Sequence, residues 1–190
     1  MHPDKASYFA LLRDSIRNTL ACGPAGNAAS AAELDLGLSL EAMRADFDRA
    51  TRLGRKVIFI GNGGSNAIAS HMASDICKNG GVRAIAFNDS SALTMLGNDF
   101  GYEMVFSKQI EFHGLPGDVL VAISSSGGSS NILAAARRAL LMGLELYTFT
   151  GAVRSAENTL RGLGKLNFIV PCTDYGIVEL SHASLIHSVI

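Results

Sequence analysis

Two short segments rich in glycine and serine each follow an apolar run with the pattern of a buried strand. Residues 61–65 (GNGGS) follow VIFI at 57–60, and residues 124–130 (SSSGGSS) follow VLVAI at 119–123. Glycine lets a backbone approach a ligand closely, and the N–H groups that begin a helix attract an anion. The simpler interpretation is a pair of tight turns in which serine caps the next helix. Two such loops in one small sheet favour a phosphate site, formed above all by residues 124–130.

Other phosphate motifs fit these loops poorly. The dinucleotide fingerprint needs a third glycine where this chain has Asn66, and the Gly-Lys-Ser/Thr of a P-loop is absent. The expected ligand is therefore a monophosphate that carries no nucleotide.

A second group of candidate residues is titratable. His71 and Asp75 lie four residues apart, so they share one face of an expected helix. Glu179, His182 and His187 lie on the expected last helix, where Glu179 and His187 are separated by about 12 Å of helix rise. This spacing is demanding for two ligands of one ion, and His182 is the rival ligand. A structural histidine is the alternative at each position, but the two clusters together indicate a metal site or an acid/base site.

The rest of the pattern predicts the elements that position these residues. Short apolar runs alternate with amphipathic stretches, which is typical of a parallel sheet covered by helices on both faces. We expect a single domain with a helical N-terminal extension (1–54) and a three-layer α/β core (55–190) around five parallel strands. Strands are expected at 57–60, 83–87, 119–123, 146–150 and 167–170, and core helices at 65–79, 90–113 with a break at Gly97, 130–142, 155–163 and 177–190. In the extension, helices are expected at 5–20 and 40–53, around a Gly/Pro/Ala-rich break.

Composition narrows the class of protein. The 190 residues are 48% hydrophobic and 17% charged, so the chain can bury a core and is not disordered. A net charge of −1 leaves no basic footprint for nucleic acid. No apolar run approaches the roughly 20 residues that span a bilayer, and the N-terminus has no apolar signal segment. The three cysteines form no CxxC pair, so we expect free thiols in the cytoplasm.

Several motifs together resemble the sugar isomerase (SIS) domain family. They are GNGGS at 61–65, His71, GNDFG at 97–101, GDVL at 117–120 and ISSSG at 123–127. Over essentially the whole chain, the sequence is similar to the phosphoheptose isomerase branch. The resemblance implies a flavodoxin-like SIS fold and a cytoplasmic homotetramer with active sites between subunits, often with zinc. It also implies conversion of sedoheptulose 7-phosphate to D-glycero-D-manno-heptose 7-phosphate, a precursor for lipopolysaccharide or capsule heptose.

The resemblance also implies roles for particular residues. Asn62 and Asp99 would face the sugar. The phosphate would be bound by Ser65, Ser124, Ser125, Ser126 and Ser129. The zinc and acid/base set would be His71, Asp75, Glu179 and His187. The family usually has glutamate at position 75, glutamine at 179 and asparagine at 128, and a basic residue just before position 179, within the stretch 173–177. These departures surround the sugar and the metal, so they bear on the substrate more than on the fold.

The implied reaction moves a proton between C1 and C2 through an enediol, so it needs a base and an acid. Asp75 or Glu179 is the candidate base, with His187 as its partner, and zinc would polarise the carbonyl. Two alternatives stay open: a non-catalytic phosphosugar-binding regulator, of the type that associates with a replication initiator, or an isomerase of another phosphosugar. Such non-enzymatic relatives tend to lose the histidine at the position of His187, so its presence favours an enzyme.

Overall fold

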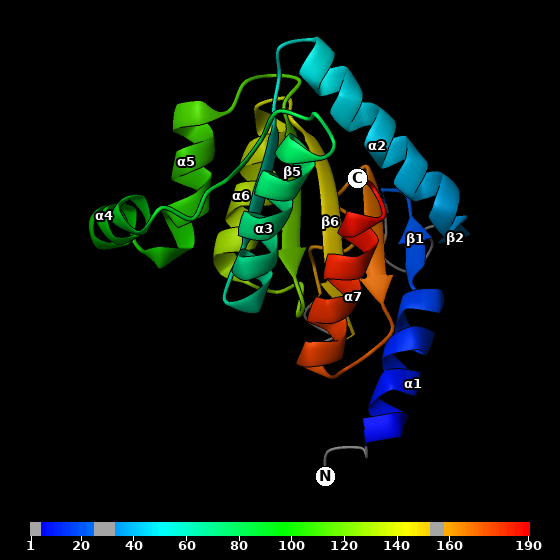
Figure 1. The fold of residues 1–190 in the computed structure, drawn as a ribbon. Helices are drawn as coiled ribbons and strands as arrows, with labels where there is room; N and C mark the ends of the chain where they lie inside the picture. Colours follow the sequence, from blue (N-terminus) through cyan, green and yellow to red (C-terminus); the bar gives the residue numbers. More distant parts are fainter. Residues whose placement is uncertain (1–4, 25–32, 153–157) are drawn as a thin grey trace.

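A seven-stranded sheet forms the centre of the molecule in the computed structural model, which describes residues 5–24, 33–152 and 158–190 (Figure 1). The strands are β1 (Leu20–Cys22), β2 (Glu33–Leu34), β3 (Val57–Gly61), β4 (Ala84–Ala86), β5 (Val119–Ser124), β6 (Glu145–Gly151) and β7 (Leu166–Val170). Their order is β2-β1-β7-β6-β5-β3-β4, and β3 to β7 are parallel. The five expected parallel strands are therefore confirmed.

Two antiparallel strands extend this sheet where the sequence predicts only helices and a loop. β1 pairs antiparallel with β7, and β2 pairs antiparallel with β1. β1 has three residues and β2 has two, which is too short for an alternating pattern to show in the sequence. Their pairing depends on the edge of β7. The N-terminal extension is thus partly a sheet edge.

The helices account for most of the remaining described residues. They are α1 (Lys5–Arg17), α2 (Leu36–Arg52), α3 (Gly64–Lys78), α4 (Ser90–Phe100), the 3-10 turn η1 (Tyr102–Met104), α5 (Val105–His113), α6 (Ser130–Leu141) and α7 (Tyr175–His187). The break expected at Gly97 lies instead at Gly101, whose φ of 89° suits glycine and ends α4. The helix expected at 155–163 is wrong for residues 158–163, which form an irregular segment with a turn at 161–163. The first residues of the expected helix, 155–157, lie outside the described ranges.

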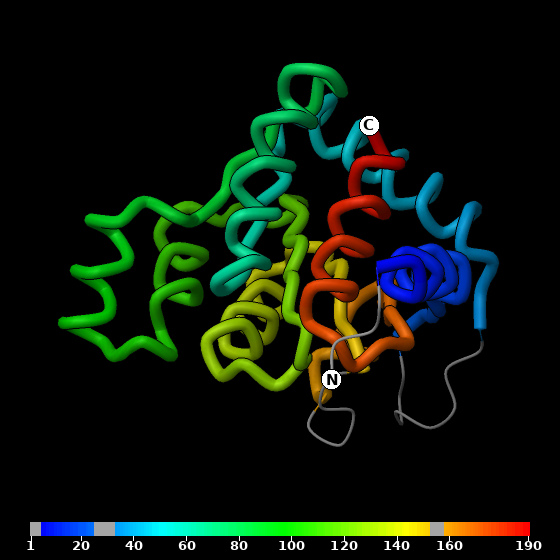
Figure 2. The backbone as a smooth tube through the Cα atoms, turned by 60° about the horizontal axis from the view of Figure 1, so that its bottom comes forward, coloured from blue at the N-terminus to red at the C-terminus, as the bar shows by residue number. Residues whose placement is uncertain are grey.

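Alternate strand residues feed two cores, one on each face of the sheet. Val57 and Phe59 face the core that α2, α3 and α7 cover, and α1 packs on its margin. Ile58 and Ile60 face the core that α4, α5 and α6 cover. Figure 2 shows α3 and α7 running side by side on the first face, with α4 and α5 projecting away from them. This arrangement confirms the three-layer α/β prediction. No helix within the described ranges is long and apolar enough to cross a membrane.

The strand order locates the place where a ligand should bind. Numbered along the chain, the five parallel strands have the order 2-1-3-4-5, the flavodoxin-like arrangement. From the neighbouring strands β3 and β5, the chain passes to α3 on one face and to α6 on the other. Ligands of open α/β sheets bind at such a switch point, beyond the carboxyl ends of the strands. Both glycine/serine loops lie there.

Candidate active site

A cavity of about 130 Å³ opens at the switch point between β3 and β5. It is lined by Asn62, Ser65, Ile123, Ser124, Ser125, Ser126, Ser129, Tyr175 and Glu179. All five serines predicted to hold phosphate line this cavity, and residues from both loops meet in it. The sequence reasoning did not single out Tyr175, which begins α7. Apart from Ile123, the described lining residues of the cavity carry neutral hydroxyls and an amide, and Glu179 is the one charged side chain among them.

Of the three helices that begin at the cavity, α3 and α6 lack a side-chain cap, as does α5 elsewhere in the molecule, whereas α7 has one. The side chains of Asp35, Asp89 and Asp174 accept the capping hydrogen bond of α2, α4 and α7. Gly63 and Ser129 hold the equivalent positions of α3 and α6, and neither makes a side-chain capping bond to any described residue. Ser129 therefore does not cap α6 through its side chain, as the simpler interpretation of this loop expects. The N–H groups of the first turn and the positive end of the helix dipole make the start of each of these helices suitable for an anion.

Glycine at position 127 is required by the path of the serine loop. Its φ is 67°, and an added Cβ would lie 1.8 Å from Oδ1 of Asn158. The Gly127 N–H donates to the carbonyl of Ser124 at 3.0 Å, which closes the turn. Asn158 in turn donates to the carbonyl of Gly151 and so holds the loop against the end of β6. Asn158 lies in the stretch predicted as helix, where nothing in the pattern marks this role.

Ser125 carries a buried hydroxyl that has no hydrogen-bond partner within the described ranges. The residue is 5% exposed and lines the cavity. A buried hydroxyl without a partner is unfavourable, and such groups call for an explanation such as a ligand atom. The Oγ atoms of Ser124 and Ser129 lie 3.4 Å apart at the same loop. One of these two hydroxyls donates to the other, so the Ser125 hydroxyl is the serine group of this loop that no described residue uses.

Glu179 reaches this cavity from α7. An added Cβ on Gly64 would lie 2.4 Å from Oε2 of Glu179, so the carboxylate sits directly against the first turn of α3. A carboxylate is favourable at the positive end of a helix dipole. Glycine at position 64 gives this carboxylate the space it needs. α7 thus places a carboxylate beside the loops that suit phosphate.

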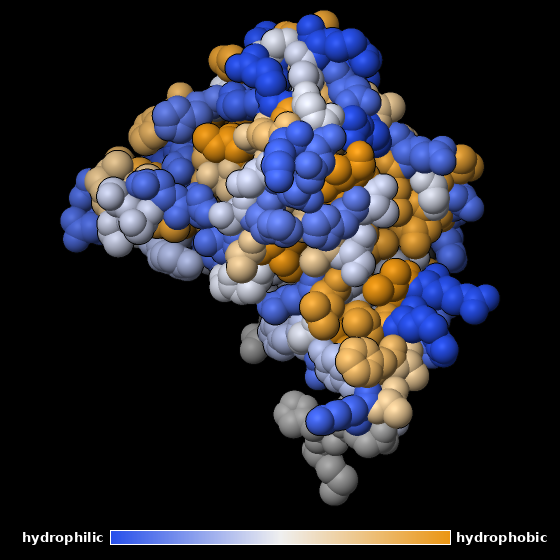
Figure 3. Space-filling model, in the orientation of Figure 1, coloured by the Kyte–Doolittle hydropathy of each residue, from blue (hydrophilic) through white to orange (hydrophobic). Residues whose placement is uncertain are grey.

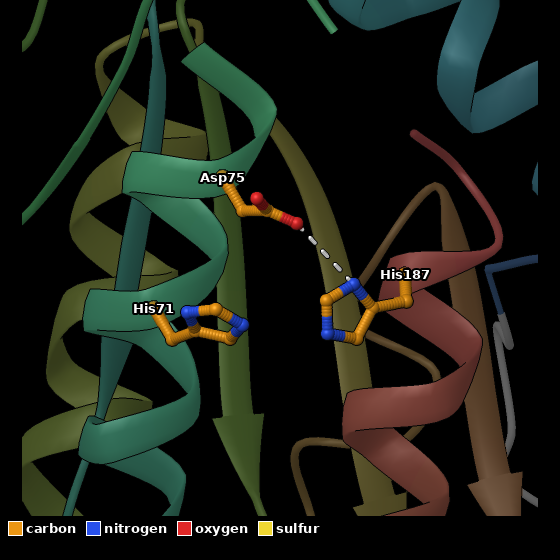
Figure 4. Close-up of side chains that lie close together, drawn as sticks. All are labelled: His71, Asp75 and His187. Carbon is orange, nitrogen blue, oxygen red and sulfur yellow. Dashed lines mark ion pairs between the residues drawn. The ribbon is translucent and has the colours of Figure 1, made fainter. Parts of the chain in front are cut away.

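A separate cluster joins α3 to the other end of α7 (Figure 4). His71, Asp75 and His187 each offer a ligand atom, and these atoms lie within 4.8 Å of one another. Nδ1 of His187 is 3.4 Å from Oδ2 of Asp75, while Asn79 donates to the other Asp75 oxygen at 2.5 Å. Two imidazoles and a carboxylate match the three protein ligands of a catalytic zinc site with a fourth position open. Among the described residues, the cluster consists of these three side chains. Glu179, the fourth residue of the predicted metal set, lies against Gly64 instead.

His182, the rival ligand, points into the core. It is fully buried, its Nε2 lies 3.1 Å from the carbonyl of Thr150, and its ring packs edge-on against Phe149. Burial lowers the pKa of His182 to about 4, so the ring is neutral. The hypothesis of His182 as the rival ligand is wrong, because packing directs it toward the sheet.

Asp99 does not line the described cavity. It lies in the last turn of α4, it is exposed, and it accepts a hydrogen bond from Asn98. Asp99 can therefore contact a sugar only if the sugar extends from the cavity to α4, or if the sugar is bound by another subunit.

Comparison with known proteins agrees with this geometry. The SIS domain profile matches residues 39–151, which include β3, β5 and both loops. A phosphoheptose isomerase from Bradyrhizobium sp. (strain BTAi1) is 38% identical over 182 residues, which cover 93% of this chain and 90% of that protein. This chain belongs to the SIS domain family, in its phosphoheptose isomerase branch. The family membership predicted from the sequence motifs is therefore confirmed.

Further members of the family support the same conclusion. The phosphoheptose isomerase of Burkholderia pseudomallei (strain K96243) is 42% identical over 142 residues, covering 72% of this chain and 71% of that protein. The solved structure of phosphoheptose isomerase from Neisseria gonorrhoeae superposes with a TM-score of 0.77 at 29% identity. That match covers 97% of this chain and 94% of the other, so the SIS fold extends beyond the span of the profile.

Proposed function

We propose that this protein is a phosphoheptose isomerase that interconverts sedoheptulose 7-phosphate and D-glycero-D-manno-heptose 7-phosphate. The observation that carries the proposal is a single cavity where two uncapped helix N-termini and a serine loop share a wall with the Glu179 carboxylate. An anion site beside a base is what an isomerase of a phosphorylated sugar needs. The relatives named phosphoheptose isomerase support the same enzyme class, an intramolecular oxidoreductase.

The phosphate group anchors the substrate in this proposal. The N–H groups of α3 and α6 and the hydroxyls of Ser65, Ser124, Ser125, Ser126 and Ser129 hold it without a cationic side chain in the described cavity wall. Binding the phosphate fixes the far end of the sugar. Binding energy from this non-reacting group can therefore be used to orient C1 and C2.

Glu179 is the proposed proton carrier at carbon. Its carboxylate lines the cavity, whereas the Asp75 carboxylate is engaged by Asn79 and His187. In the ketose-to-aldose direction, Glu179 takes a proton from C1 and returns it to C2, while a proton moves from O1 to O2. His187 is the partner for this exchange at oxygen, since Asp75 faces its Nδ1 and leaves Nε2 to exchange a proton.

His71, Asp75 and His187 are the proposed zinc ligands, because their donor set and spacing fit that ion. Zinc bound there would polarise the substrate carbonyl and stabilise the enediolate. Residues that coordinate a metal are poorer bases, which supports Glu179 rather than Asp75 at carbon. By the same argument, His187 is proposed to exchange the proton at oxygen only while it is released from the metal. Glu179 itself is proposed to bind the metal only by moving from its position at Gly64.

We also propose a homotetramer with its active sites at subunit interfaces. The 130 Å³ cavity of one chain is small beside the roughly 300–1,000 Å³ of typical ligand pockets, so a seven-carbon phosphosugar extends out of it. Phe9 on α1 is 67% exposed and Tyr175 on α7 is 49% exposed. Apolar side chains gather over α1 and the adjoining end of α7 (Figure 3). Light scattering is expected to give four subunits, and a monomer at micromolar concentration would contradict this.

A cytoplasmic location is proposed from the thiols. Cys22, Cys77 and Cys172 are all free, and Cys77 is exposed. An exposed free thiol suits a reducing compartment.

The proposed function is tested by incubating the protein with a panel of ketose and aldose phosphates and following each by NMR. Sedoheptulose 7-phosphate is expected to convert fastest. Faster conversion of another phosphosugar would reassign the substrate, and binding without turnover across the panel would indicate a phosphosugar-binding regulator.

A further inference from the structure

The carboxamides of Asn62 and Asn131 form a reciprocal pair across the switch point. Nδ2 of Asn62 donates to Oδ1 of Asn131 at 2.9 Å, and Nδ2 of Asn131 donates to Oδ1 of Asn62 at 2.9 Å. Asn62 immediately follows β3, and Asn131 is the second residue of α6. The pair therefore joins the glycine loop to the helix that follows the serine loop.

A backbone group fixes which way the two amides face. The N–H of Ile132 donates to Oδ1 of Asn131 at 2.9 Å, and only the oxygen end of a carboxamide can accept such a bond. The Asn131 nitrogen must then donate to Asn62, so the facing atom of Asn62 is its oxygen. Tyr102 donates its hydroxyl to the same Asn62 oxygen at 3.1 Å.

This arrangement leaves Asn62 one hydrogen-bonding position. A carboxamide has two donor N–H groups and an oxygen with two lone pairs. Asn131 and Tyr102 occupy both lone pairs of Asn62, and Asn131 also takes one N–H. The other N–H is the position with no partner among the described residues. Because Asn62 lines the cavity, this N–H is what its side chain can offer a ligand.

We infer that Asn131 is a positioning residue that orients Asn62, so that Asn62 presents a single N–H donor to an oxygen of the bound phosphosugar. This inference rests on the proposed function. Asn131 is 2% exposed and is not among the residues that line the cavity, so it acts through Asn62. A buried carboxamide is unfavourable unless it is hydrogen-bonded, and this one uses both lone pairs of its oxygen and one of its N–H groups inside the protein.

The pairing makes Asn62 selective as well as ordered. A carboxamide that was free to rotate could accept from a hydroxyl or donate to an oxygen. With its oxygen occupied, Asn62 offers a donor alone, which suits a carbonyl, a hydroxyl oxygen or a phosphate oxygen. Tyr102, in the η1 turn between α4 and α5, adds a contact from the projecting part of the molecule.

The inference is tested by a double-mutant cycle on the full chain, with kcat and KM measured for sedoheptulose 7-phosphate. Asn62→Ala and Asn131→Ala are each expected to lower kcat/KM by about 10–100-fold, the range for a misplaced substrate-positioning group. The double variant is expected to have the same kcat/KM as Asn62→Ala alone, because Asn131 acts through Asn62. Gln109→Ala is the matched control: it removes a buried carboxamide that bonds to Val105 in α5, and should keep wild-type kcat/KM.

A second variant covers the case in which Asn131→Ala does not fold. Tyr102 is 61% exposed, so Tyr102→Phe removes its bond to Asn62 with little effect on the fold. It should lower kcat/KM several-fold in the wild-type background and not at all in Asn62→Ala. Losses from Asn131→Ala or Tyr102→Phe that multiply with the Asn62→Ala loss would overturn the inference, as would wild-type kinetics in either variant. An unmodified protein that does not isomerise the substrate would instead contradict the proposed function.

Discussion

Nδ1 of His187, in the last turn of α7, lies 3.4 Å from Oδ2 of Asp75 on α3. The two residues are 112 positions apart in the sequence, and the packing of α7 against α3 brings them together. The His71 ring lies 5.2 Å from the His187 ring, measured between centroids, and completes the cluster. The contact makes the proposed metal site depend on both helices.

Replacing His187 tests this site. With a ligand removed, His187→Ala is expected to lose the bound metal, which should be about one zinc ion per subunit in the unmodified protein. Isomerase activity should fall by about 100-fold or more. Elemental analysis of the purified proteins measures the metal. His113→Ala, which removes an exposed histidine on α5, should keep both metal and activity, and full zinc content in His187→Ala would move the site elsewhere.

Glu179→Gln separates the two candidate bases. Glutamine has nearly the same shape but cannot accept a proton at neutral pH, so kcat should fall by about 10²–10⁴-fold if Glu179 carries the proton. Binding of the phosphosugar should persist or strengthen, since a negative charge leaves the cavity wall. Steady-state kinetics and calorimetry measure the two effects. Near-normal kcat would assign the base role to Asp75.

Ser125→Ala tests the phosphate cavity without disturbing the fold. The hydroxyl has no partner among the described residues, so its removal should leave thermal stability nearly unchanged. Losing a hydrogen bond to a charged group should weaken binding of sedoheptulose 7-phosphate by about 1.5–3 kcal/mol in calorimetry. Thr150→Val is the matched control, because it removes another buried hydroxyl without a described partner, outside the cavity lining. Equal affinities in Ser125→Ala and the unmodified protein would place the phosphate elsewhere.

Burial of His182 predicts a loss of stability in acid. Its pKa is lowered from 6.5 to about 4, so the unfolded chain takes up a proton below pH 6.5 while the folded chain resists until about pH 4. The free energy of unfolding should therefore fall by up to about 3 kcal/mol across that window. Urea unfolding at pH 7 and at pH 4 spans this window and measures the change. His182→Gln can still donate to the Thr150 carbonyl and should flatten the dependence, whereas His113→Gln should not. An unchanged slope in His182→Gln would contradict the assignment.

The core strands and the two loops could be predicted from local sequence. Apolar runs such as those at 57–60 and 119–123 need both faces covered, and small residues after them permit close approach of a ligand. β1 and β2 could not be predicted, because they are too short to carry a pattern and form only against the edge of β7. The sequence also could not show that α4 ends at Gly101 rather than at Gly97, since glycine can occupy both a helix interior and a position with positive φ.

The sequence by itself determined which residue types the site has: serines and glycines after strands, and carboxylates and imidazoles at helical spacing. Only the tertiary structure decided which of them meet. Glu179 joins the serine-lined cavity through its position against Gly64, His187 lies beside Asp75, and His182 is buried in the core. These three share one helix, so their separation depends on how α7 packs against α3 and the sheet. Asn131 likewise meets Asn62 because β3 and β5, which are far apart in the sequence, are hydrogen-bonded neighbours in the sheet.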